Sequence, residues 1–164
     1  MGNSGGSLTT RSAGETTRST GELHQLMREA GFTGVDDTEA LAEGWQVTDF
    51  ADVGRRSLAH LVERTGTPAV MVSFFDSDVG FIEARTPDGD SWEGLLNRET
   101  AESYEIPLEH FPVEPAVAGA LAWSAAAGLT PDERAIRQTL TGSALFAEEL
   151  SSALLVALGL PGAT

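Results

Sequence analysis

Residues 67–97 read TPAVMVSFFDSDVGFIEARTPDGDSWEGLLN, and the rest of the chain is expected to pack around this stretch. Ala69–Phe75 is rich in Val, Met and Phe, a composition typical of a buried strand. Phe81–Thr86 alternates apolar and charged residues, and Ser91–Leu96 supplies a third extended segment. Both connections are short and rich in Asp, Ser, Pro and Gly, which favour tight turns. The stretch therefore predicts a three-stranded antiparallel meander.

The first strand of this meander is apolar on both sides. Alternation places Val70, Val72 and Phe74 on one face and leaves Met71 and Phe75 on the other. A strand with two apolar faces belongs in the middle of a sheet or beneath helices. Ser91–Leu96 is interrupted by a glycine and is the better candidate for an edge strand.

Five further segments precede the meander. Residues 1–20 consist of Gly, Ser, Thr and Arg with almost no apolar side chains, which predicts a disordered tail before a single domain over residues 21–161. An amphipathic helix is expected over Gly21–Ala30, with Ser19 or Thr20 as its cap. Asp36–Ala42 favours a weak helical turn, Trp45–Val47 a short extended piece, and Phe50–Glu63 a longer helix.

The chain after the meander is predicted to be mainly helical. Tyr104–Ile106 is a candidate fourth strand. Three helices follow, over Pro115–Ala127, over a segment that opens with Thr130–Glu133 and ends at Leu140, and over Ser143–Leu158. The sequence thus predicts an α+β fold, in which an antiparallel meander of three or four strands is flanked by an N-terminal helical lead and a C-terminal three-helix layer.

Composition excludes several chemistries. The 164 residues contain no cysteine and no lysine, which rules out thiol catalysis, Schiff-base catalysis and Cys-ligated metals. Arginine as the main cation, with abundant Ala and Gly, suggests a GC-rich bacterial coding sequence. The net charge of −15 argues against nucleic-acid binding, because phosphates would be repelled. No apolar run reaches the length of a membrane span and no secretory signal is evident, so a cytoplasmic protein without a cofactor is expected.

The acidic side chains are unevenly distributed. The segment Asp76–Glu114 has eleven acidic and two arginine residues, a net charge of −9. Such a field accelerates association with basic proteins. The leading hypothesis is therefore a non-catalytic module, of inhibitor, immunity, chaperone or adaptor type, that binds a basic partner. Its candidate partner-binding residues are Asp76, Asp78, Glu83, Asp88, Asp90, Trp92 and Glu93.

Two alternatives remain. The first is a metal-assisted hydrolase, in which Asp76 and Asp78 hold a divalent cation with one more acid, and His110 lies in an irregular segment where sites tend to occur. Neither acidic turn completes a calcium-binding loop, and Thr141–Leu145, which precedes a plain helix, does not match G-x-S-x-G. The second alternative is a structural homodimer through the last helix, which requires an exposed apolar stripe.

Overall fold

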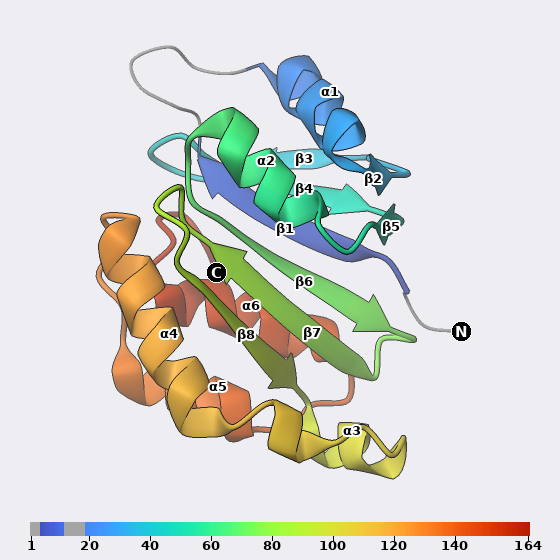
Figure 1. The fold of residues 1–164 in the computed structure, drawn as a ribbon. Coiled ribbons are helices and arrows are strands. Elements are labelled where there is room, and N and C mark those ends of the chain that lie inside the picture. The colour runs from blue at the N-terminus through green and yellow to red at the C-terminus, as the bar shows by residue number, and fades with distance from the viewer. Residues whose placement is uncertain (1–3, 12–18) are drawn as a thin grey trace.

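The computed structural model describes residues 4–11 and 19–164. Within these residues the main element is a six-stranded antiparallel sheet, shown in Figure 1. Its strands, in spatial order, are β3 (Thr38–Ala40), β4 (Trp45–Phe50), β1 (Gly6–Arg11), β6 (Ala69–Phe75), β7 (Val79–Arg85) and β8 (Ser91–Leu96). The fold is α+β, as the sequence predicts.

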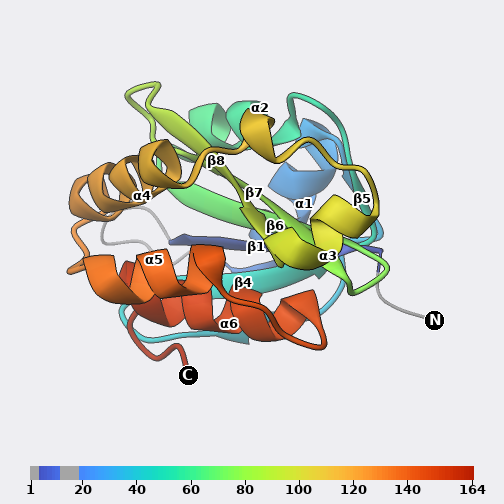
Figure 2. The same cartoon turned by 90° about the horizontal axis from the view of Figure 1, so that it is seen from below.

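Helices cover both faces of the sheet, as Figures 1 and 2 show. α1 (Thr20–Ala30) and α2 (Ser57–Thr65) lie on one face, beside a two-stranded ladder of β2 (Phe32–Thr33) and β5 (Asp52–Val53). The other face carries the C-terminal helices α4 (Val113–Ala126), α5 (Glu133–Thr141) and α6 (Ala147–Leu158). The described residues therefore form three layers.

Each face of the sheet has its own apolar core because side chains alternate along the strands. Val70, Val72 and Phe74 of β6 pack with the C-terminal helices. Met71 of the same strand packs with Leu8 and with α1 and α2. The prediction that Ala69–Phe75 is a central strand with two apolar faces is confirmed.

The expected disordered tail is wrong for Gly6–Arg11. These residues form β1, which pairs with β4 on one side and β6 on the other. Leu8 is fully buried, and at Gly6 a Cβ atom would lie 2.5 Å from both the Phe50 ring and the Val72 carbonyl oxygen. The domain therefore includes residues before position 21. Residues 1–3 and 12–18 of the predicted tail lie outside the residues that the structure describes.

Three further local predictions are wrong. Asp36–Ala42 is not a helical turn, because Thr38–Ala40 pairs with β4. The helix expected from Phe50 begins only at Ser57, since Phe50 ends β4 opposite Gly6. Tyr104–Ile106 is not a strand and instead follows the short helix α3 (Arg98–Ser103). In each case the local sequence pattern is a weaker determinant than strand pairing: two segments pair with a neighbouring strand, and the third has no strand to pair with among the described residues.

The helix ends follow the expected chemistry more closely. Ser19 accepts a hydrogen bond from the backbone of Glu22, and Gly31 ends α1 in the left-handed conformation. α5 begins at Glu133, three residues after the predicted opening at Thr130, with Asp132 as its side-chain cap. α6 begins at Ala147 rather than Ser143. Strand β8 lies at the edge of the sheet, as predicted.

Candidate functional site

The predicted acidic site residues do not converge. Asp76 and Asp78 lie in the turn between β6 and β7, whereas Asp88 and Asp90 lie in the turn between β7 and β8, at the other end of β7. Seven residues of extended β7 separate the two turns, a span of about 20 Å. A single partner-binding face that includes both turns would have to extend along the whole strand.

Glu83 and Glu93 oppose each other on β7 and β8. Arg85 lies beside them, and its Nε is 2.8 Å from Glu83 Oε2. The adjacent candidate, Trp92, points to the opposite face, is only 6% exposed and packs on Gly119 of α4. The side chain of Trp92 is part of the core, which gives little support to the expectation that it contacts a partner.

Large exposed apolar side chains surround the β6–β7 turn. We call the following four residues the Phe75 surface: Phe75 (49% exposed), Tyr104 (43%), Leu145 (78%) and Phe146 (50%). The rings of Phe75 and Tyr104 meet edge to face, with centroids 5.3 Å apart. Figure 2 shows α3, this turn and the start of α6 at the same end of the molecule. Exposed aromatic clusters of this kind mark interaction sites.

Hydrogen bonds hold the components of the Phe75 surface against the turn. The backbone N–H of Ala147 donates to the Ser77 carbonyl oxygen at 2.7 Å. Asn97, only 1% exposed, donates from Nδ2 to the carbonyl oxygens of Asp78 and Ala144 and accepts the Ala144 N–H. The segment that carries Leu145 and Phe146 is thus fixed at both ends.

The backbone is strained around this surface. Of the five described non-glycine residues with positive φ, four belong to this end of the molecule: Asp76 (51°), Ser77 (61°), Asn97 (65°) and Glu105 (63°). Such conformations persist only where surrounding contacts enforce them, and they concentrate at functional sites. The geometry therefore favours a surface that is preformed.

Carboxylates accompany the apolar side chains. The Tyr104 hydroxyl donates a hydrogen bond to Asp78, and this bond, followed by partial burial and the charges of Asp78 and Asp76, raises the pKa of Tyr104. Ser77 donates to Glu148 Oε2 at 2.7 Å, and Glu149 accepts the backbone N–H of Phe146. This end of the molecule therefore combines exposed apolar side chains with negative charge.

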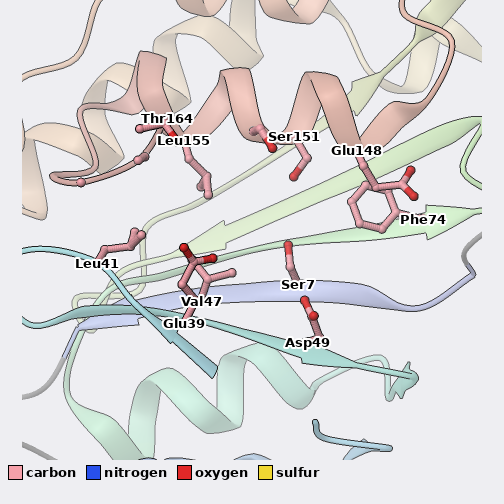
Figure 3. A pocket seen from close by; sticks show the side chains of 13 residues that line it. Ser7, Glu39, Leu41, Val47, Asp49, Phe74, Glu148, Ser151, Leu155 and Thr164 are labelled. Atoms are coloured by element: carbon pink, nitrogen blue, oxygen red, sulfur yellow. The ribbon is translucent and has the colours of Figure 1, made fainter. Parts of the chain in front are cut away.

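A groove of about 350 Å³ lies between α6 and the sheet, on the side of β1, β3 and β4 (Figure 3). Carboxylates of Glu39, Asp49 and Glu148 line it, with apolar surface from Val47, Phe74 and Leu155. Partial burial, and then the charges of Asp37, Asp36 and Glu39, raise the pKa of Asp49. Sequence reasoning missed this groove because its acids come from three separate segments.

The residues invoked for a metal-assisted hydrolase are not brought together. His110 ends a short 3₁₀ helix over Leu108–His110, and Asp78 is hydrogen bonded to Tyr104. Within residues 4–11 and 19–164, no three His, Asp or Glu side chains are grouped so that they could hold a metal ion. Of the other histidines, His24 is hydrogen bonded to Thr38 at 2.7 Å.

Comparison with known proteins does not assign the chain to a family. No family model, no curated protein sequence and no solved structure matches the chain. No helix in the described part of the chain has the length and apolar character needed to cross a membrane.

Proposed function

We propose that the chain is a non-catalytic protein-binding module that engages a basic partner through the Phe75 surface. The observation that carries the proposal is the exposure of four large apolar side chains around one acidic, strained turn. Aromatic residues dominate the binding energy of protein interfaces, and a polar rim supplies orientation and encounter rate. An inhibitor or immunity-type protein, or a chaperone or adaptor in the cytoplasm, would use such a surface.

The charge of the module supports a basic partner. The whole chain carries −15, so a second copy would be repelled, whereas a cationic protein would be attracted over about a Debye length. The backbone constraints on Ser77 and Asn97 limit the ordering that binding requires. Preorganisation of this kind increases affinity without adding contact area.

A homodimer through the last helix has less support. The stripe of α6 that would form such an interface packs in the core, with Leu154 and Leu158 fully buried. Val156, on the outer side of α6, is 49% exposed. It therefore provides a control position for removal of exposed apolar surface away from the turn.

The test is quantitative capture of partners by the immobilised full chain from an extract of its own cells. We expect a basic protein whose capture weakens as NaCl rises from about 50 to about 500 mM. The double variant Phe75→Ala/Leu145→Ala should reduce its affinity by about tenfold or more. Val156→Ala should leave it unchanged.

Thermal unfolding of each variant checks that the fold is retained. Phe75 is 49% exposed and Leu145 is 78% exposed, so their truncation should shift the melting temperature little. If every basic protein captured by the wild-type chain were captured equally by the double variant, the proposed surface would be wrong.

A further inference from the structure

The groove between α6 and the sheet shares Glu148 with the surroundings of the Phe75 surface but has its own chemistry. Three carboxylates line it, and none of its described lining residues is basic. Figure 3 shows Glu39 and Glu148 toward opposite ends, with Asp49 and Ser7 between them. The acids are therefore spread along the groove instead of being gathered at one point.

Two polar side chains of α6, Ser151 and Glu148, line this space. Ser151 lines the groove, is only 5% exposed, and its hydroxyl has no hydrogen-bond partner among the described residues. The Oε1 atom of Glu148 is buried and also lacks a partner there, while Oε2 accepts the Ser77 hydroxyl. The Ser151 hydroxyl and the Glu148 carboxylate offer hydrogen-bond acceptors to a ligand at this end of the groove.

The charges of the groove define the ligand further. Asp36, Asp37 and Glu39 all disfavour ionisation of Asp49, so a cation beside Asp49 would relieve mutual repulsion. Since the described acids form no group able to hold a metal ion, a compact divalent cation fits poorly. Apolar side chains between the carboxylates favour an elongated cation with hydrocarbon between its charges.

We propose that this groove binds a linear aliphatic polyamine, with its ammonium groups on Glu39, Asp49 and Glu148. The methylene chain lies over Val47, Phe74 and Leu155, and the ammonium at the α6 end donates to Glu148 and Ser151. A triamine matches the three carboxylates in number. This site shares only Glu148 with the surroundings of the proposed protein-binding surface, and the proposal does not depend on that surface.

The test is calorimetric titration of the full chain with spermidine at about 150 mM NaCl, an ionic strength that suppresses diffuse counterion binding. We expect saturable binding of one spermidine per chain. Glu148→Gln and Asp49→Asn should each weaken it by about tenfold. Asp88→Asn removes the same charge from an exposed turn outside the groove and should leave the affinity unchanged.

A second variant keeps the test valid if Glu148→Gln disturbs the fold. Ser152 lines the groove and is exposed, so Ser152→Lys should fold and place an ammonium where the ligand binds. We expect it to abolish spermidine binding, while Phe75→Ala should not affect it.

Two results would overturn the proposal. Weak, multisite binding that falls equally in Asp88→Asn and Asp49→Asn would show diffuse attraction to an acidic protein. Binding of a lysine-containing peptide but not of spermidine would assign the groove to a protein segment.

Discussion

The turn between β6 and β7 is enclosed by other parts of the chain, whereas the turn between β7 and β8 projects into solvent. In the first, Ser77 is 5% exposed, and both its carbonyl and its hydroxyl are bound by the start of α6. In the second, Asp88, Gly89 and Asp90 are all exposed, and the turn is closed by its own backbone bonds to Thr86.

Both turns contain two aspartates separated by one residue, so charge does not distinguish them. The distinguishing property is what surrounds each turn. The enclosed turn lies beside α3, α6 and exposed aromatic side chains, and its strained backbone is fixed by Asn97. An acidic turn becomes a candidate binding site when tertiary contacts hold it rigid and place apolar surface beside it.

Asn97→Ala is expected to have the largest effect on the contacts that enclose the β6–β7 turn. The change leaves the Asp78 and Ala144 carbonyl oxygens and the Ala144 N–H without their partner, and it places alanine at φ 65°. We expect a loss of about 2–4 kcal/mol in the free energy of unfolding, measured in urea. Asn97→Gly should be about 1 kcal/mol less damaging, since glycine tolerates this φ. A loss below about 1 kcal/mol for Asn97→Ala would contradict the enclosed character of the turn.

Ser77→Ala should have the next largest effect. It removes a hydrogen bond of 2.7 Å to Glu148, whose other oxygen already lacks a partner among the described residues. Because the acceptor is a carboxylate, we expect a loss of about 1–2 kcal/mol. The comparison is Asp90→Ala in the exposed turn, which should remain within about 0.5 kcal/mol of wild type. Equal losses in the two variants would remove the distinction between the turns.

Gly89→Ala isolates backbone strain in the exposed turn. Gly89 has φ 96°, and a Cβ at this position would have no atom within 4 Å. The expected cost is therefore about 1 kcal/mol and arises from the dihedral alone. Urea unfolding measures it. A loss above about 2 kcal/mol would mean that this turn is packed against other residues.

Asp49→Asn should give the smallest effect, and it should be stabilising. The folded protein raises the pKa of Asp49, so its ionised form is disfavoured by folding at neutral pH. Replacement by Asn should raise the melting temperature by about 1–2 °C at about pH 7. This gain should vanish as the pH falls below the ordinary range of an aspartate, where the wild-type carboxyl is protonated in both states. Asp88→Asn serves as the control at an exposed turn and should show no gain at either pH.

Sequence reasoning succeeded where local chemistry and burial agree. The meander was predictable because Ala69–Phe75 is densely apolar and both turns contain strong turn formers. Ser19 and Gly31 bound α1 as their chemistry requires. Strand β1 was missed because its segment has one large apolar residue. Its Thr10 is nevertheless buried, with its hydroxyl bonded to the Pro68 carbonyl oxygen.

The candidate sites were less accessible from the sequence. Asp76 and Asp78 were identified by their charge, but the apolar partners Tyr104, Leu145 and Phe146 lie far away in the chain. The groove acids Glu39 and Glu148 are separated by more than a hundred residues and meet only after α6 packs on the sheet. The adjacent Leu145 and Phe146 before α6 were the one local signal of an exposed apolar pair.

The position of β1 has a consequence for fragment complementation. Among the described strands, only β1 connects the β3–β4 hairpin to the β6–β7–β8 meander within the sheet, and it pairs antiparallel with both neighbours. A chain that starts after Arg11 would expose two strand edges separated by about 10 Å, the width of one inserted strand. Such a truncated chain becomes a receptor, and a synthetic peptide of residues 4–11 becomes the ligand that completes its sheet.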